Sequence, residues 1–207
     1  MAVSLVLASR SPRRAELLER LGLDFTIEPA DIDESFVDHL MPSDHAERLA
    51  REKAVYVGNE HPEALVVGSD TIVVVGRDVL GKPRDEEDAV RMLERLSGSE
   101  HEVHTGVAVA HLGRVESAVE RVRVRFRRFP RSFAEAYVAT GEPMDKAGAY
   151  GIQGYGSALV ERIEGDYFAV MGLPVVRTLT LFERLGWRYD FGGLVELEKD
   201  EAGSAGR

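Results

Sequence analysis

Ser9, Arg13 and Arg14 lie where a short apolar run gives way to an amphipathic helix, and their side chains suit phosphate binding. Residues 5–8 are apolar and predict a buried strand, and Pro12 is favoured in the first turn of a helix. Unpaired N–H groups and the positive dipole end of a helix attract anions, and arginine offers forked donors to phosphate oxygens. The segment predicts a phosphate-binding loop. The alternative is a solvated helix start with two surface arginines.

Asp70 interrupts two very apolar runs, residues 64–68 and 72–75, each of which predicts a buried strand. A carboxylate among such residues is rare unless it is paired or functional. One interpretation is an aspartate that forms a turn between two strands. We favour the other, an acid or base at an active site, because perturbed carboxylates gather in such sites.

Lysine is scarce in this chain, so each lysine is informative. Lysine and arginine together number 26, of which only Lys53, Lys82, Lys146 and Lys199 are lysine. Lys53 falls on the apolar face of a helix predicted to begin at Ser43 or Asp44 and to end near residue 58. It is either a cation that points into a site or a lysine at the edge of the stripe whose ammonium reaches water. Lys82 precedes Pro83, which favours an extended backbone.

Two long irregular segments carry further candidate site residues. Residues 29–42 form an acidic loop that includes Glu34, and long loops are often functional. Residues 140–156 are rich in glycine and include Gln153. We interpret these glycines as positions where the backbone approaches a ligand closely. A flexible linker is the alternative, although its isoleucine and tyrosines are unusual for one.

The composition narrows the class of protein. The chain has 207 residues, a formal net charge of −10 and no cysteine, which excludes disulfides, thiolate metal sites and a cysteine nucleophile. We find neither a secretion signal nor an apolar run long enough to cross a bilayer, and we expect a cytoplasmic protein without membrane contact. The negative charge argues against a nucleic-acid binder. The arginines of residues 121–127 alternate with apolar residues, and we expect them on a solvated sheet face beside acidic neighbours.

The rest of the chain predicts one α/β domain over residues 1–190, followed by a polar tail over residues 191–207. We expect helix caps at Asp85 and Ser132. The sequence further predicts strands at residues 24–28, 101–111, 115–129 and 158–164, with a last helix over residues 175–185.

Five motifs together resemble those of the Maf proteins in order and spacing, over about residues 5–185. They are Ser9-x-Ser-Pro-Arg13-Arg14, Gly68-Ser69-Asp70-Thr71, Gly81-Lys82-Pro83, Asp145-Lys-Ala-Gly-Ala-Tyr-Gly-Ile-Gln153-Gly and Gly172-Leu-Pro174. The resemblance implies a mixed central sheet flanked by helices, with two lobes around a cleft, related to inosine triphosphate pyrophosphatases. It also implies a nucleoside triphosphate pyrophosphatase that is often dimeric. The glycine-rich segment is similar to that of the branch that hydrolyses dTTP and UTP, and differs from that of the branch acting on 7-methyl-GTP.

The residues support a mechanism for such a reaction, in which water attacks the α-phosphorus and pyrophosphate leaves. Asp70 would accept the proton of the water, and Lys53 and Lys82 would neutralise the bridging and leaving oxygens. The expected substrate-binding residues are Ser9, Arg13, Arg14, Thr71 and Gln153. A divalent cation, Mg²⁺ first and Mn²⁺ as the alternative, would bridge phosphate oxygens and Glu34 or Asp70.

Gln153 would recognise the base, because its amide donor and acceptor match O4 and N3–H of uracil or thymine. This pairing ignores the 5-methyl group and the ribose 2′-hydroxyl, so UTP, dTTP and modified pyrimidine triphosphates are all expected substrates. Two functional alternatives remain open: a 7-methyl-GTP pyrophosphatase, or a non-catalytic nucleotide-binding regulator of septum formation. The expected partners are a nucleoside triphosphate and a second copy of the chain in a homodimer.

Overall fold

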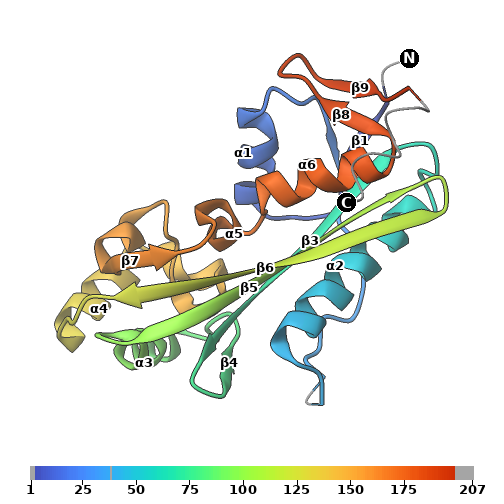
Figure 1. Cartoon of the computed structure of the whole chain (residues 1–207). Coiled ribbons are helices and arrows are strands. Elements are labelled where there is room, and N and C mark those ends of the chain that lie inside the picture. Colours follow the sequence, from blue (N-terminus) through green and yellow to red (C-terminus); the bar gives the residue numbers. More distant parts are fainter. Residues whose placement is uncertain (1–2, 38, 199–207) are drawn as a thin grey trace. The chain divides into compact units, whose positions relative to one another are not determined.

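The computed structural model describes residues 3–37 and 39–198, and these residues form a mixed α/β fold (Figure 1). The longer helices are α1 (Pro12–Arg20), α2 (Pro42–Gly58), α3 (Glu86–Leu96), α4 (Arg131–Val138) and α6 (Val175–Arg184), and a shorter one is α5 (Tyr167–Met171). The strands are β1 (Leu5–Leu7), β2 (Thr26–Ile27), β3 (Leu65–Val75), β4 (Asp78–Leu80), β5 (Glu100–His111), β6 (Arg114–Phe126), β7 (Val160–Glu164), β8 (Trp187–Tyr189) and β9 (Leu194–Glu196). None of the described helices has the length and apolarity needed to span a membrane.

The main sheet is mixed, as the family resemblance implies. Its strand order is β2-β1-β3-β5-β6-β7, and β4 pairs with β3. Strand β1 runs parallel to β2 and β3, whereas β3–β4 and β6–β7 are antiparallel pairs. Strand β1 and the residues of β3 that pair with it, 65–67, are apolar and buried, as expected for strands that are covered on both faces. The prediction of a mixed sheet flanked by helices is confirmed.

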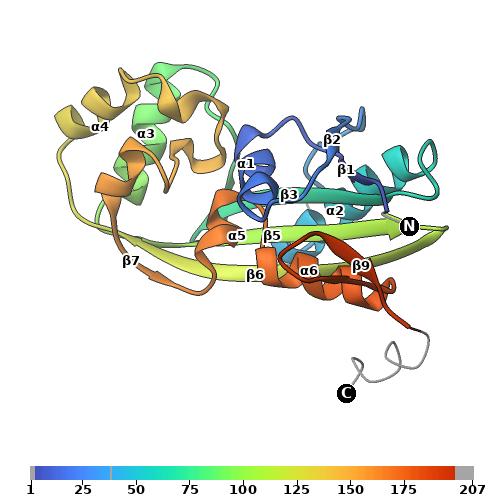
Figure 2. The same cartoon turned by 90° about the horizontal axis from the view of Figure 1, so that it is seen from above.

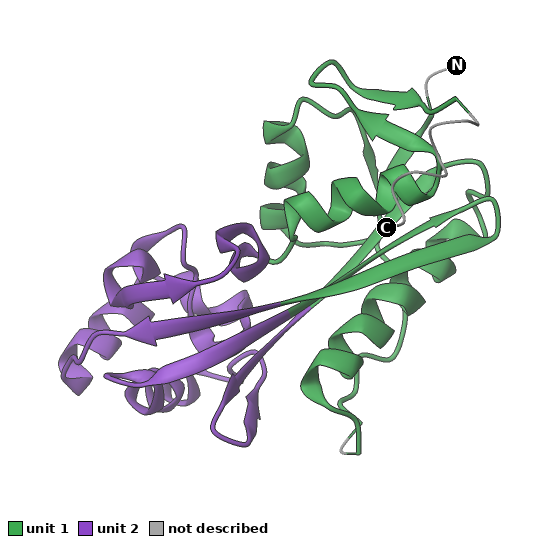
Figure 3. Ribbon diagram, in the orientation of Figure 1, with its two compact units in different colours: residues 1–70, 105–120, 172–207 green, residues 71–104, 121–171 purple. Residues whose placement is uncertain are grey.

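The chain divides into two compact units, and β3, β5 and β6 contribute residues to both (Figure 3). The first unit comprises residues 1–70, 105–120 and 172–207, and the second comprises residues 71–104 and 121–171. In β3 the boundary follows Asp70, so Asp70 belongs to the first unit and Thr71 to the second.

In the first unit, α2 packs very closely against β3 and β5. A Cβ atom added at Gly68 would lie 2.3 Å from the carbonyl oxygen of Ala50, and one added at Gly106 would lie 2.3 Å from that of Ala46. Small buried residues line the rest of this contact, among them Ala54. Because there are no side chains between them at these points, the helix backbone lies directly on the strands.

The other side of the first unit carries α1 and α6 (Figure 1). Helix α1 begins at Pro12 as predicted, and α6 buries Leu181 and Phe182. The chain then forms the hairpin β8–β9, which the sequence analysis did not predict. Trp187 Nε1 donates to His111 Nε2 at 3.3 Å. The predicted polar tail thus contains a strand, β9, while residues 199–207 lie outside the described part of the chain.

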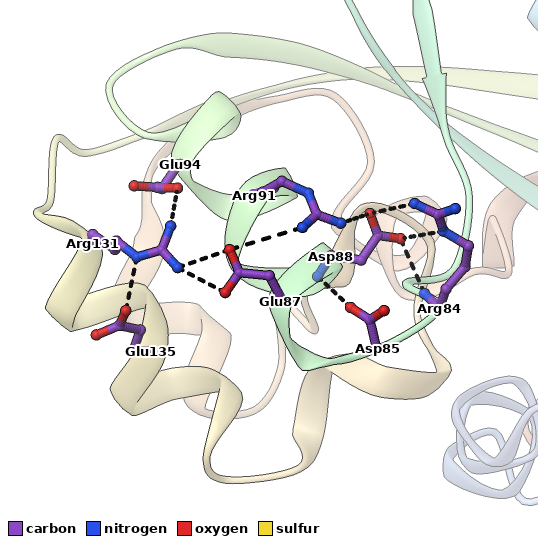
Figure 4. Close-up of polar contacts among 8 residues, drawn as sticks. All are labelled: Arg84, Asp85, Glu87, Asp88, Arg91, Glu94, Arg131 and Glu135. Carbon is purple, nitrogen blue, oxygen red and sulfur yellow. Dashed lines mark hydrogen bonds and ion pairs between the residues drawn. The ribbon is translucent and has the colours of Figure 1, made fainter.

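In the second unit, α3 and α4 lie side by side (Figure 2). Asp85 caps α3 as predicted, since its side chain accepts from the backbone N–H of Asp88. Arg131 at the start of α4 pairs with Glu87 and Glu94 of α3 and with Glu135 of its own helix (Figure 4). These pairs are exposed, and such pairs each contribute little to stability.

Several predicted local features are wrong. Strand β3 is continuous through Ser69, Asp70 and Thr71, so no turn separates the two apolar runs. Helix α2 begins at Pro42 and α4 begins directly after Pro130, and in both cases no side chain caps the first turn. The expected caps, Ser43 or Asp44 for α2 and Ser132 for α4, therefore lie inside their helices. Strand β2 is shorter than expected, and β6 ends at Phe126.

We predict that Gly68→Ala destabilises the protein strongly, because its Cβ would overlap the backbone of α2. Overpacking of this kind costs about 1–3 kcal/mol. Urea unfolding of Gly68→Ala and of the control Gly192→Ala measures the effect. The added Cβ of the control meets no atom closer than 3.4 Å, and we expect its midpoint to stay close to that of the parent. Equal midpoints for Gly68→Ala and the parent would contradict the packing described here.

Candidate active site

The ammonium of Lys53 lies between two carboxylates in the first unit. Its Nζ is 2.8 Å from Asp70 Oδ1 and 2.8 Å from Glu34 Oε1. Lys53 is 6% exposed, so the ammonium does not reach out to water at the edge of the helix. This excludes the alternative in which Lys53 only covers apolar surface. A buried ammonium requires such compensation, since an unpaired buried charge is very costly.

Asp70 lies inside the continuous strand β3. Its neighbour Ser69 is fully buried, and the Ser69 hydroxyl lies 2.7 Å from the carbonyl oxygen of Gly106 and 2.8 Å from that of Gly172. The hydroxyl thereby ties β3 both to β5 and to the segment that precedes α6. The backbone that carries Asp70 is therefore held by strand pairing and by the contacts of its neighbour Ser69.

Arg14 links the predicted phosphate loop to Gly172. Its Nε donates to the Gly172 carbonyl oxygen at 2.8 Å, and its Nη1 donates to Ser9 Oγ at 2.9 Å. Desolvation lowers the pKa of Arg14, and the carboxylates of Asp70 and Glu34 oppose this shift. Part of the Arg14 fork is therefore engaged in holding the protein itself together.

The predicted phosphate loop, with Ser9, Arg13 and Arg14, lies in the first unit. Ser9 is 7% exposed and its hydroxyl also accepts from the backbone N–H of Ser11. Arg13 is half-buried and close enough to Arg14 to depress the pKa of that guanidinium. The structure thus brings Ser9, Arg13 and Arg14 together with Asp70 in one unit.

The acidic loop that carries Glu34 is anchored on α2. Phe36 packs against His45, with ring centroids 4.6 Å apart. Burial lowers the pKa of His45, and the positive charge of Arg48 lowers it further, so the imidazole stays neutral near pH 7. The aromatic contact fixes the loop two residues beyond Glu34, and this supports the contact of Glu34 with Lys53.

Three predicted site residues belong to the second unit. Lys82 is exposed, and within the described residues it makes no hydrogen bond or ion pair. The carbonyl oxygen of Gly81, its neighbour, accepts from the backbone N–H of Gly148 at 3.1 Å, which ties the glycine-rich segment to the turn that carries Lys82. Thr71 follows Asp70 on β3 and is half-buried.

Gln153 has an unusual environment in the second unit. Its Oε1 is buried, and in the described part of the chain it has no hydrogen-bond partner. An unpaired buried acceptor costs about 1–3 kcal/mol. A ligand that donates a hydrogen bond to this oxygen would remove that cost, which fits the predicted role of Gln153.

The carboxylates suit Mg²⁺ only in part. Within residues 3–37 and 39–198, no three acidic or histidine side chains gather into a metal site. The carboxylates of Glu34 and Asp70 nevertheless lie close together, since both contact the Lys53 ammonium, and each has oxygens that could bind a cation. Mg²⁺ commonly uses one or two carboxylates and completes its shell with water and substrate phosphates. The donor set therefore fits Mg²⁺ that arrives with a triphosphate.

The arginines that alternate with apolar residues over residues 121–127, called the arginine ladder below, lie beside acidic residues of β7. Arg123 pairs with Glu164, and Arg125 Nε lies 3.4 Å from Glu161 Oε2. Arg127 lies over the ring of Phe133 at 4.5 Å. The predicted pairing of the ladder with acidic neighbours is confirmed for Arg123 and Arg125, and it reduces the positive charge available to a nucleic acid.

Sequence reasoning missed Ser69 and Gly172 as parts of the site. The backbone of Gly172 has φ +115°, which favours glycine, and its carbonyl accepts from both Arg14 and Ser69. The glycine before Leu173-Pro174 was a signal for an unusual backbone. Its two donors lie far away in the sequence, so the signal could not identify them.

Comparison with known proteins finds matches over most of the chain. A family model described as "Maf-like protein" matches residues 4–185. Many relatives carry the name dTTP/UTP pyrophosphatase, among them the following three. The one from Moorella thermoacetica is 55% identical and covers 88% of this chain and 95% of its own. The one from Halalkalibacterium halodurans is 46% identical and covers 90% of this chain and 98% of its own. The one from Aquifex aeolicus is 43% identical and covers 87% of this chain and 94% of its own.

The similarity to one solved structure is weaker. A nucleoside-triphosphatase / dITP/XTP pyrophosphatase from Mycobacterium abscessus aligns with a TM-score of 0.40 and 18% identity, over 62% of this chain and 76% of its own. At this level the likeness carries no argument about function.

We predict energetic coupling between Lys53 and Asp70. Lys53→Met removes the ammonium and leaves the mostly buried Asp70 carboxylate unpaired, which costs about 2–4 kcal/mol of unfolding free energy. In an Asp70→Asn background the same change is expected to cost about 1–2 kcal/mol less, because the unpaired charge is gone. A double-mutant cycle in urea measures the difference. Arg20→Met serves as control, since Arg20 pairs with Glu16 at an exposed site. Additive effects of Lys53→Met and Asp70→Asn would contradict the coupling.

Proposed function

Because the chain belongs to the family of Maf-like proteins, we propose that it hydrolyses dTTP and UTP to the nucleoside monophosphate and pyrophosphate. The observation that carries the proposal is the buried Lys53 ammonium held by Glu34 and Asp70. The relatives named dTTP/UTP pyrophosphatase, matched over nearly their whole length, support the substrate.

The reaction proposed is attack of water on the α-phosphorus. A bond forms between the water oxygen and the α-phosphorus, and the bond from that phosphorus to the α–β bridging oxygen breaks. Asp70 accepts the proton of the water, and pyrophosphate leaves with the bridging oxygen. Asp70 suits this task because β3 holds it firmly while Lys53 engages only its Oδ1.

Most of the remaining rate acceleration is expected from positioning and charge neutralisation. We assign Ser9, Arg13 and Arg14 to the phosphates of the substrate. Lys53 and Lys82 neutralise charge that develops on the bridging and leaving oxygens. Mg²⁺, held by Glu34 and Asp70 together with the phosphates, would supply further charge neutralisation when bound.

Base recognition is assigned to Gln153, with Thr71 as a further substrate contact. The Gln153 amide nitrogen would donate to O4 of uracil or thymine, and Oε1 would accept from N3–H. Its buried Oε1, which has no hydrogen-bond partner among residues 3–37 and 39–198, supports this assignment. Cytosine presents the opposite pattern, an amino donor and a ring acceptor, so CTP is expected to be a poor substrate while the amide is held in this orientation.

The first test is a product assay with Mg²⁺ and a panel of dTTP, UTP, CTP, ATP, GTP and 7-methyl-GTP. We expect pyrophosphate from dTTP and UTP, and a loss of about 10²–10⁴ in kcat for Asp70→Asn. Asp24→Asn, an exposed aspartate in the same unit, is the matched control.

Several outcomes of this assay would refute the proposal. Inorganic phosphate in place of pyrophosphate would mean cleavage at the γ-phosphate. A preference for 7-methyl-GTP would transfer the chain to the other branch of the family. Binding of nucleotides without any turnover would favour a regulatory role.

We further predict that Gln153→Glu lowers kcat/KM for UTP about tenfold or more, because a carboxylate cannot donate to O4. The ratio of UTP to CTP turnover should fall, since the carboxylate accepts from the cytosine amino group. Steady-state kinetics on both substrates measures this ratio. An unchanged ratio would remove Gln153 from base recognition.

A further inference from the structure

We propose that Glu142 is a positioning residue that sets base specificity by holding the segment that carries Gln153. The inference rests on the base-recognition role proposed for Gln153. It concerns only the second unit, in which Glu142 and Gln153 both lie. Glu142 opens the short 3₁₀-helix η1 (Glu142–Asp145) and is half-buried.

The Glu142 carboxylate accepts three hydrogen bonds. Its Oε1 accepts from the Tyr137 hydroxyl at 2.7 Å and from the backbone N–H of Gly156 at 3.0 Å. Its Oε2 accepts from the backbone N–H of Tyr155 at 2.8 Å. A carboxylate that accepts two backbone N–H groups fixes the chain at those residues, which here lie just beyond Gln153.

Tyr137 fixes the residues before Gln153 in a similar way. We call the hydrogen bonds that Glu142 and Tyr137 make to this segment the Glu142 frame. Its hydroxyl oxygen accepts from the backbone N–H of Gly151 at 3.0 Å while the hydroxyl donates to Glu142. Burial raises the pKa of Tyr137, and the Glu142 carboxylate raises it further, so the hydroxyl keeps its proton across the working pH range. Gln153 is thereby bracketed by fixed backbone on both sides.

The glycines of the segment are required by the frame itself. A Cβ atom at Gly154 would lie 2.1 Å from Glu142 Oε2, and one at Gly156 would lie 2.8 Å from the Tyr137 hydroxyl oxygen. A Cβ atom at Gly151 would lie 2.7 Å from Lys146 Cε. The backbone therefore wraps closely around the Glu142 and Tyr137 side chains. These contacts account for glycines that the sequence analysis attributed to a ligand.

The charge of Glu142 is satisfied mainly by these donors. Lys146 Nζ donates to the backbone carbonyl oxygen of Glu142 at 2.5 Å and pairs with Asp145 at 2.6 Å. In Glu142→Gln, one of the two carboxylate oxygens becomes an NH₂ group. That group faces a backbone N–H whichever way the amide turns, so at least one hydrogen bond is lost.

The hydrogen bonds of Glu142 and Tyr137 explain how Gln153 keeps a buried oxygen that has no partner among the residues the structure describes. The cost of the unpaired Oε1 favours any movement of the segment that would solvate it. The hydrogen bonds to Glu142 and Tyr137 resist that movement and hold the amide ready for N3–H of the base. An amide that is already held in its binding position raises the affinity for the substrate and the discrimination between bases.

The test is Glu142→Gln in the full-length chain, assayed with UTP and CTP. We expect the ratio of kcat/KM for UTP to that for CTP to fall about tenfold, mainly through a higher KM for UTP. Glu135→Gln is the matched control, because Glu135 lies on α4 near Tyr137 and its side chain pairs, in the described part of the chain, only with the exposed Arg131. In a Gln153→Ala background, Glu142→Gln should change this ratio no further.

Hydrogen–deuterium exchange of residues 150–157 gives a second readout that does not depend on turnover. We expect faster exchange of this segment in Glu142→Gln and in Tyr137→Phe, with the exchange of β5 unchanged. Tyr137→Phe keeps the aromatic ring and serves if Glu142→Gln folds poorly.

The outcomes separate this inference from the proposed function. Unchanged exchange, or an unchanged UTP to CTP ratio in Glu142→Gln while Gln153→Glu alters it, would overturn the role of Glu142 and leave base recognition by Gln153 standing. An unchanged ratio in Gln153→Glu would overturn both assignments.

Discussion

The ammonium of Lys53, buried between Glu34 and Asp70, is the interaction on which the candidate active site depends. Such an ammonium is stable only if its partners reach it, and here the partners come from a loop and a central strand. The helix that carries Lys53 must therefore lie unusually near the sheet. Gly68 and Gly106 permit this approach, since neither leaves a side chain between α2 and the strands. The close packing at the small residues of the core therefore sets the position of the charged residues of the site.

Much of the fold followed from local sequence signals. Pro12, Asp85 and the apolar runs marked helix starts and strands that the structure contains, because the forces behind them act over a few residues. The break predicted at Asp70 is wrong for the opposite reason. Polar residues inside a strand look like a turn when only neighbours are considered. Ser69 is instead satisfied by the carbonyl groups of Gly106 and Gly172, which no local pattern reveals.

The candidate site was predictable in its residue types but not in its contacts. Asp70 and Lys53 stood out as charges among apolar residues, and the structure pairs them directly. Their link to Glu34 depends on how a long irregular loop folds, which periodicity does not encode. The glycine-rich segment was noticed for its composition. Its partner Glu142 escaped notice because a single glutamate in a polar stretch looks like an ordinary solvated residue.

The Glu142 frame and the Lys53 arrangement differ in how their parts are distributed along the chain. All the hydrogen bonds of the frame lie within residues 137–156, one continuous stretch. The Lys53 arrangement draws on three separate segments that must change in concert. A continuous stretch can be exchanged between related genes in a single recombination event and carry its own supporting contacts with it. In evolution, base preference can therefore diverge by local replacement while the hydrolytic chemistry stays the same.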